Sequence, residues 1–190
     1  MFVELQRKYP LQNIINQARL KDTTSLELCK IHHHFGNLLG MEILGAQPLV
    51  SKTKTLATGK KENLCYNDDR NFVIIGILRA GLYIAEGVRA IFPKAIYRLA
   101  NSPEESLKML KNKKIILVDS VVNSGRTIEA FLQKIPSENT LYLATSVVYE
   151  PTKERLALSY ALRIVTIRIS KNSYIGQGGS DTGNRLFHTY

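Results

Sequence analysis

The sequence is poor in cysteine and contains no tryptophan. Cys29 and Cys65 are its only two cysteines in 190 residues. Two widely spaced thiols form neither a disulfide framework nor a zinc site. A chain with so few cysteines is typical of a reducing compartment, so we expect a cytoplasmic protein.

Long apolar segments are absent as well. No apolar run approaches the roughly 18 residues that a membrane span requires. The first residues, Met1 to Glu4, lack the basic and apolar regions of a signal peptide. We therefore expect neither a membrane span nor a signal peptide.

Acidic residues are outnumbered by basic ones. The chain has 16 aspartates and glutamates against 26 lysines and arginines, so its formal net charge is +10. A basic chain of this size favours an anionic partner, which is a nucleic acid, an anionic membrane surface or a phosphorylated small molecule. The alternative is a solvated basic surface without a specific ligand.

The length and the hydrophobic fraction of 44% suit one domain with its own core. We expect that domain to span residues 1–190, with N-terminal helices and an arm over 1–70, a core over 71–170 and a C-terminal loop over 171–190. Helices are predicted over 10–20 and 24–43, the second of them opened by a capping box of Thr24 and Glu27. The intervening residues 45–70 read as an irregular loop or a short arm.

From residue 72 onward, apolar strands alternate with helical segments. This order predicts right-handed crossovers and an α/β fold with a mostly parallel central sheet flanked by helices. Ligands of such sheets bind at the carboxyl ends of the strands. The predicted strands cover 72–78, 95–99, 114–118, 141–149 and 162–169, and the predicted helices cover 82–92, 103–110, 127–134 and the residues after Pro151.

Two segments of this core carry candidate phosphate-binding residues. In the first, a buried strand ends at Asp119 and a loop rich in hydroxyls and glycine leads into a helix, which is a suitable phosphate site. The alternative there is a plain turn capped by Ser124 or Thr127. In the second, Arg79 follows a buried strand, where a guanidinium is suited to an anion. The alternative is an ion pair with a nearby carboxylate such as Glu86.

The third candidate is the C-terminal segment, residues 174–187. Its four glycines let the backbone approach a flat ligand and read the edge of a heterocycle with N–H and C=O groups. Asp181 is its only acid. A flexible C-terminus is the alternative, although Leu186 and Phe187 favour a segment that folds back and packs.

Taken in this order, the three segments resemble the uracil phosphoribosyltransferase family of type I phosphoribosyltransferases. Residues 77–81 match its Ile-Leu-Arg-Ala-Gly segment, and residues 119–127 align with its loop Asp-Pro-Met-Leu-Ala-Thr-Gly-Gly-Ser. Residues 174–187 align without a gap with Tyr-Ile-Val-Pro-Gly-Leu-Gly-Asp-x-Gly-Asp-Arg-Leu-Phe. The likeness covers nearly the whole chain and implies synthesis of uridine 5-phosphate (UMP) and pyrophosphate from uracil and 5-phosphoribosyl 1-pyrophosphate (PRPP), in pyrimidine salvage.

The resemblance also implies roles for individual residues. Arg79 and Asp181 would act in catalysis, and Mg²⁺ would be bound mainly through PRPP rather than by a protein metal site. The implied PRPP-binding residues are Arg79, Arg98, Asp119, Ser120, Val121, Val122, Asn123, Ser124, Gly125, Arg126, Thr127 and Asp181. The implied uracil-binding residues are Ile175, Ser180, Asp181 and Thr182. Relatives form dimers or larger assemblies, so a homodimer is expected on analogy.

The chain departs from the family pattern in several places. Ser120 replaces a proline, Arg126 a glycine and Asn184 an aspartate, and Asn123-Ser124 and Gly179-Ser180 differ from the family's residues. The stretch between Phe92 and Lys113 is too short for the family's long mobile hairpin. Tyr97-Arg98 is either a remnant of that hairpin or part of a strand.

These departures keep two alternatives open. One is a catalytically weak relative that binds PRPP or a nucleotide for regulation, and the other is a transferase for another pyrimidine-like base. A metal site at His32-His33-His34 is disfavoured, because consecutive helical positions point about 100° apart. The lysines of residues 52–61 lack interleaved aromatic residues, so nucleic-acid binding is not expected.

Overall fold

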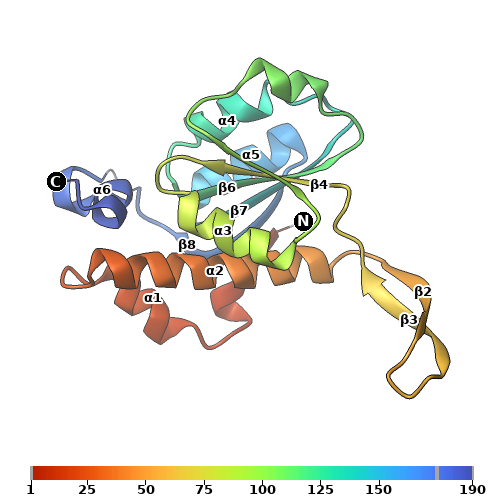
Figure 1. Cartoon of the computed structure of the whole chain (residues 1–190). Coiled ribbons are helices and arrows are strands. Elements are labelled where there is room, and N and C mark those ends of the chain that lie inside the picture. Colours follow the sequence, from red (N-terminus) through yellow and green to blue (C-terminus); the bar gives the residue numbers. More distant parts are fainter. Residues whose placement is uncertain (1, 174–175, 190) are drawn as a thin grey trace.

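The computed structural model describes residues 2–173 and 176–189. Its centre is a six-stranded sheet with the order β1-β8-β7-β6-β4-β5, in which every strand pair is parallel (Figure 1). The strands are β1 (Phe2–Glu4), β4 (Phe72–Ile77), β5 (Ile96–Ala100), β6 (Lys114–Val122), β7 (Thr140–Tyr149) and β8 (Arg163–Ser170). The predicted α/β class is confirmed, and β1, which the sequence did not predict, is only three residues long.

Helices cover both faces of this sheet, as Figure 1 shows. On one side lie α1 (Gln12–Arg19), α2 (Ser25–Gly45) and α3 (Leu82–Ile91), and on the other lie α4 (Arg126–Leu132) and α5 (Glu150–Tyr160). Short α6 (Thr182–Phe187) follows the sheet, and 3₁₀ turns occupy Leu5–Arg7, Glu105–Met109 and Gly178–Ser180. No helix in the described part of the chain is long and apolar enough to cross a membrane.

The two helical layers produce two hydrophobic cores. Strand β4 is buried at all six positions, and its side chains alternate between the faces of the sheet. Phe72 and Ile74 join the cluster beneath α2 and α3, whereas Val73 and Ile75 join the cluster beneath α4 and α5. Burial on both faces explains the continuous apolar run in the sequence.

The start of α2 is the one that the sequence predicts. The Glu27 backbone N–H donates to Thr24 Oγ1, and the Thr24 backbone N–H donates to Glu27 Oε2 at 2.9 Å. This reciprocal capping box satisfies donors that the first helical turn leaves free. The helix ends at Gly45, close to the predicted boundary.

Residues 45–70 form an arm, but not an irregular one. Strands β2 (Leu49–Thr55) and β3 (Lys61–Asn67) pair as an antiparallel hairpin that projects from the body of the protein (Figure 1). Nearly all of its residues are exposed. A hairpin without a buried face lacks the apolar alternation by which strands are identified, so the sequence did not predict it.

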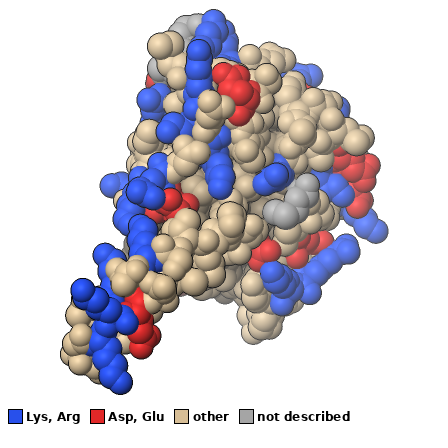
Figure 2. Space-filling view, turned by 90° about the vertical axis from the view of Figure 1, so that its right-hand side faces the viewer, with Lys and Arg blue, Asp and Glu red and all other residues tan. Residues whose placement is uncertain are grey.

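Charge is dispersed over one face of the molecule, which Figure 2 shows. On the face shown in Figure 2, lysines and arginines spread over the arm and the body and alternate with acidic side chains. That face therefore offers no continuous basic groove of the kind that follows a nucleic-acid backbone.

The connection between β5 and β6 is short. Residues 101–113 contain only a 3₁₀ turn, Glu105–Met109, where the sequence predicted a helix over 103–110. Tyr97 and Arg98 lie inside β5 and pair with Ile74 and Ile75 of β4. Of the two alternatives for Tyr97-Arg98, the strand is therefore the one observed.

Two glycines allow α2 and α3 to cross at close range. A Cβ atom at Gly36 would lie 2.1 Å from the carbonyl oxygen of Ile84, and one at Gly87 would lie 2.1 Å from that of His33. Backbone atoms cannot yield as a flexible side chain can, so any larger residue separates the two helices.

We predict that Gly36→Ala lowers the free energy of unfolding by at least about 2 kcal/mol, because the added methyl group forces α2 and α3 apart. Chemical denaturation measures the change. Gly45→Ala is the matched control on the same helix, since a Cβ there meets nothing within 4 Å. Equal stability of the two variants would contradict the packing argument.

Candidate active site

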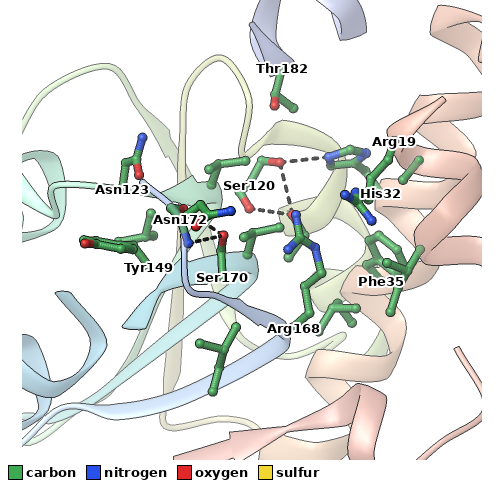
Figure 3. A pocket seen from close by; sticks show the side chains of 18 of the residues that line it. Arg19, His32, Phe35, Ser120, Asn123, Tyr149, Arg168, Ser170, Asn172 and Thr182 are labelled. Carbon is green, nitrogen blue, oxygen red and sulfur yellow. Dashed lines mark hydrogen bonds between the residues drawn. The ribbon is translucent and has the colours of Figure 1, made fainter. Parts of the chain in front are cut away.

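A cavity of about 520 Å³ opens at the carboxyl ends of β6, β7 and β8. Helices α1 and α2 close it on one side and the C-terminal segment on another (Figure 3). It lies at the sheet edge where the sequence predicted ligand binding. Its residues from the candidate loop and the C-terminal segment are Ser120, Val121, Val122, Asn123, Ser180, Thr182 and Arg185.

A buried hydrogen-bond network forms one wall of the cavity. His32 Nδ1 donates to the carbonyl oxygen of Leu28 at 2.8 Å, so Nε2 is the acceptor for the hydroxyl of Ser120, also at 2.8 Å (Figure 3). The Ser120 carbonyl oxygen accepts from Thr145 Oγ1 at 3.0 Å and from Ser146 Oγ at 2.5 Å. From the sequence, His32 was considered only as a metal ligand, and its role in this network was not predicted.

The network fixes the charge of His32. Burial lowers the pKa of His32 to about 4, and the positive charge of Arg185 acts in the same direction. The imidazole is therefore neutral at physiological pH and serves as an acceptor. The described residues contain no group of three potential metal-ligating side chains.

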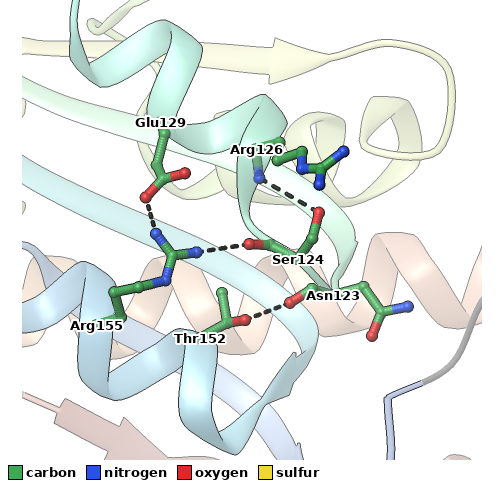
Figure 4. A network of polar contacts seen from close by, with 6 residues as sticks. All are labelled: Asn123, Ser124, Arg126, Glu129, Thr152 and Arg155. Carbon is green, nitrogen blue, oxygen red and sulfur yellow. Dashed lines mark hydrogen bonds and ion pairs between the residues drawn. The ribbon is translucent and has the colours of Figure 1, made fainter.

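The loop after β6 is held from beneath by α5. Thr152 Oγ1 donates to the carbonyl oxygen of Asn123 at 2.5 Å, and Arg155 Nη2 donates to that of Ser124 at 2.6 Å (Figure 4). Arg155 also forms an ion pair with Glu129. These contacts occupy loop carbonyl groups and define the path of the loop before α4 begins.

Gly125 is the N-cap residue of α4, with a φ angle of 77°. A side chain is disfavoured there twice, by the left-handed backbone and by Thr152 Cγ2, which would lie 2.7 Å from an added Cβ. Gly125 has no side chain that could cap the helix, but Ser124 Oγ accepts a weak hydrogen bond from the backbone N–H of Arg126 at 3.5 Å (Figure 4). The alternative of a turn capped by Ser124 therefore stays open. Arg126 is exposed and extends away from Arg155 (Figure 4).

Asp119 lies near the end of β6, just before the buried Ser120. Its Oδ1 accepts a hydrogen bond from the backbone N–H of Ser120 at 2.7 Å. Removal from water raises the pKa of Asp119 to about 7, against the smaller opposing effect of that hydrogen bond. A carboxyl group that titrates near neutrality at the carboxyl edge of a sheet is a candidate for function.

Arg79 is bound by the C-terminal segment. Its guanidinium donates to Asn184 Oδ1 at 2.8 Å and to Thr189 Oγ1 at 3.0 Å, and lies 5.9 Å from the ring centre of Phe187. The predicted alternative, an ion pair with Glu86, is wrong, because Glu86 pairs with Arg89 at 3.8 Å. The two side chains that accept hydrogen bonds from Arg79 are thus both neutral.

The C-terminal segment packs as Leu186 and Phe187 indicated. Leu186 is 2% exposed, Phe187 lies against Tyr83, and Arg185 donates to the carbonyl oxygens of Ala18 and Leu20. The described part is therefore not a flexible tail. Tyr174 and Ile175, the second of them a predicted base-binding residue, lie outside the described residues.

Asp181 lies beside Arg79. Its carboxylate caps α6 by accepting from the Asn184 backbone N–H at 2.8 Å. A Cβ at Gly183 would lie 3.2 Å from Asp181 Oδ1 and 3.8 Å from Arg79 Nη2, so this glycine keeps the space between the two side chains open. The structure thereby brings together the two residues that were predicted to act in catalysis.

The structure does not bring Arg98 to this cavity. Arg98 lies on the edge strand β5 and lines a second cavity of about 230 Å³ together with Ile75, Leu99 and Glu104. Its predicted contact with PRPP therefore remains a prediction without support from the main cavity.

Comparison with known proteins identifies the relatives of this chain. The sequence model of the family described as uracil phosphoribosyltransferase matches residues 6–189. A uracil phosphoribosyltransferase from Aquifex aeolicus is 28% identical, over 98% of each chain, and one from Ralstonia pickettii is 26% identical, over 94% of this chain and 91% of the relative. Among solved structures, the AQ2163 protein from Aquifex aeolicus superposes with a TM-score of 0.82 at 23% identity, covering 100% of this chain and 99% of its own.

We predict a pH-dependent contribution of His32 to stability. In the unfolded chain His32 takes up a proton near pH 6.5, whereas the folded protein resists protonation down to about pH 4. The free energy of unfolding should therefore fall as the pH drops through this window, by about 3 kcal/mol from His32 alone.

Denaturation of wild type and His32→Gln at several pH values measures this contribution. Asp119 acts in the opposite direction, because its raised pKa favours the folded state at low pH, so the informative quantity is the difference between the two proteins. His34→Gln, at an exposed position of the same helix, should keep the wild-type dependence. Parallel curves for wild type and His32→Gln would refute the assignment.

Proposed function

Because the chain belongs to the uracil phosphoribosyltransferase family, we propose that it transfers the phosphoribosyl group of PRPP to uracil and so forms UMP and pyrophosphate. The observation that carries the proposal is the cavity itself. It joins loop residues Val121 to Asn123, on the side expected for the donor, to Ser180 and Thr182 of the C-terminal segment, on the side expected for the base.

The chemistry needs positioning more than a nucleophilic side chain. The bond from C1′ to the pyrophosphate oxygen breaks, and its electron pair leaves with pyrophosphate. The N1 atom of the base forms a new bond to C1′ and loses its proton, which is taken up by the leaving pyrophosphate or by water. The protein must hold N1 near C1′ and stabilise the departing anion.

Arg79 suits the second task. Its guanidinium is exposed and is oriented by Asn184 and Thr189, neither of which neutralises its charge. These two neutral acceptors orient the guanidinium and leave its positive charge available to the pyrophosphate. Asn184, which replaces an aspartate of the family pattern, preserves the orientation and removes the competing negative charge.

Asp119 suits the ribose. A carboxylate at the carboxyl end of β6 accepts hydrogen bonds from sugar hydroxyls when it is ionised, and its raised pKa means that ligand binding decides its charge near neutrality. The family resemblance implies a Mg²⁺ ion that is bound mainly through PRPP oxygens and water. That ion would help to neutralise the pyrophosphate.

The short β5–β6 connection favours a second candidate function. Residues 101–113 hold a 3₁₀ turn rather than a long hairpin, so this connection supplies little that could close over the donor and exclude water. A regulatory relative that binds PRPP without rapid turnover is compatible with such an open site.

The homodimer and the cytoplasmic location expected from the sequence stay predictions.

The first experiment incubates the protein with uracil, PRPP and Mg²⁺ and detects UMP by chromatography. UMP formation supports the transferase and shows that the long hairpin is dispensable. Donor binding by calorimetry without any product would instead favour the regulatory protein. Absence of both product and donor binding would refute both functions.

We predict that Arg79→Gln lowers kcat by about a hundredfold or more, because the departing pyrophosphate loses its charged partner. Steady-state kinetics with uracil measures the loss. Lys94→Gln removes one positive charge from an exposed position just after α3 and should leave kcat within about twofold. A similar loss in both variants would point to a general effect of net charge.

We also predict that PRPP binding with Mg²⁺ near pH 7 releases about half a proton from Asp119, because the bound ligand favours the carboxylate of a group with a pKa near 7. Calorimetry in two buffers of different ionisation enthalpy measures this release. Asp119→Asn should lack this component. Equal proton release by wild type and Asp119→Asn would show that another group titrates.

A further inference from the structure

Basic side chains from several elements line the cavity. Arg19 from α1, Arg168 from β8, Lys171 after β8 and Arg185 from α6 all line it. No aspartate or glutamate is present among the described residues that line it. Four basic side chains without an acid around one cavity favour a ligand that brings negative charge.

Arg168 carries this argument furthest. It is half-buried on β8, and Figure 3 shows its side chain extending into the cavity toward Ser120 and His32. Arg185, by contrast, is satisfied by the carbonyl oxygens of Ala18 and Leu20. Within residues 2–173 and 176–189, the guanidinium of Arg168 has no hydrogen-bond or ion-pair partner.

The surroundings of Arg168 add to its need for an anion. Burial lowers the pKa of Arg168, and the positive charge of Arg19 lowers it further. The neutral His32 supplies no compensating charge. The positive charges of Arg19 and Arg168 repel each other, and a partly desolvated guanidinium without a partner costs free energy. An anion bound beside Arg168 would offset both effects.

We call Arg19, Arg168, Lys171 and Arg185 the cationic wall. This wall lies in the cavity where the acceptor base is expected. The same cavity reaches Ser180 and Thr182, on the side where the base is expected, and Val121 and Asn123 of the loop after β6. Its volume of about 520 Å³ falls within the range of about 300–1,000 Å³ that holds drug-sized ligands, so it has room for more than a bare pyrimidine ring.

We propose that the preferred acceptor of this enzyme is a pyrimidine-like base that carries a carboxylate, which forms a bidentate pair with Arg168 beside Arg19. This inference rests on the proposed phosphoribosyl transfer and replaces uracil with a carboxylated relative as the preferred acceptor. The reaction is unchanged: N1 bonds to C1′, pyrophosphate leaves with the electron pair, and the carboxylate stays on the base. A planar guanidinium matches a carboxylate in geometry as well as in charge.

A neutral base fits this wall less well. Uracil offers Arg168 only neutral carbonyl acceptors, and so would leave the charge of a partly desolvated guanidinium uncompensated. A site with a buried charged group discriminates strongly against ligands that lack the matching group. The donor already has proposed partners, which are Arg79 for its pyrophosphate, Asp119 for its ribose and the loop after β6 for its 5-phosphate, so Arg168 is left for the acceptor.

The test compares uracil, 5-carboxyuracil and 6-carboxyuracil as acceptors, with PRPP and Mg²⁺, by steady-state kinetics. We expect one carboxylated base to exceed uracil in kcat/KM by about tenfold or more. Arg168→Gln should lower this ratio by about tenfold or more, chiefly by raising KM for the carboxylated base, because the glutamine amide retains polarity without charge.

Arg163→Gln is the matched control on the same strand. Arg163 lies at the start of β8, donates to the Tyr142 hydroxyl at 2.9 Å and is absent from the cavity lining. It should leave the ratio of the two acceptors unchanged. Thermal unfolding of both variants establishes that each is folded under assay conditions.

The outcomes separate this inference from the proposed function. Transfer to uracil with no use of the carboxylated bases overturns the inference and leaves the uracil transferase intact. Preference for a carboxylated base that persists in Arg168→Gln overturns the assignment to Arg168. No transfer to any of the three bases overturns the acceptor role together with the proposed transfer.

A second experiment measures the binding of inorganic phosphate by calorimetry. If phosphate binds wild type as tightly as the carboxylated base does, and Arg168→Gln abolishes both, the wall takes a free anion and the acceptor assignment falls. Weaker binding of phosphate than of the carboxylated base supports the acceptor, because the base then adds contacts with the C-terminal segment.

Discussion

The site depends on the requirement that every polar group buried at the end of β6 finds a hydrogen-bond partner. Ser120 is fully buried, and its hydroxyl donates to His32 while its carbonyl oxygen accepts from Thr145 and Ser146. These bonds tie β6 to α2 and to β7. The loop after β6 therefore starts from a rigid point, which is the condition for placing its backbone against a ligand.

The same requirement differentiates the arginines around the site. Arg155 has both an acid and a carbonyl partner and holds the loop in place. Arg185 donates to two carbonyl oxygens and anchors the C-terminal segment on the C-terminal end of α1. Arg79 has neutral oxygens that orient it, and Arg168 has no partner in the described chain. An arginine without an acidic partner in the protein is better placed to bind an anionic ligand than one that already pairs with a carboxylate.

Closure of the site also differs from the family pattern. The short β5–β6 connection leaves Tyr97 and Arg98 in a strand, whereas α1, α2 and the C-terminal segment wall the cavity from the other side. A 3₁₀ turn in this connection is thus combined with a wall of helices on another side of the cavity. Water exclusion would then depend on the fit of the base in the cavity rather than on movement of a hairpin.

The sequence by itself determined the features that depend on neighbouring residues. The capping box of Thr24 and Glu27 is a local hydrogen-bond pattern, and the buried run of β4 follows from its apolar side chains. The loop after β6 and the C-terminal segment were identified for the same reason, because each places its candidate residues within a few positions of one another. Composition and local order therefore sufficed for the α/β class and for two segments that line the cavity.

Only the tertiary structure decided which distant residues meet. Strand β1 is stable because it pairs with β8, and nothing in three residues signals that pairing. His32 and Ser120 are 88 positions apart, and the cationic wall draws Arg19 from α1 and Arg168 from β8. No local pattern relates such residues, since their contact is created by the packing of α1 and α2 against the carboxyl ends of the strands. The cavity and its charge thus belong to the fold, whereas the segments that border it could be read from the chain.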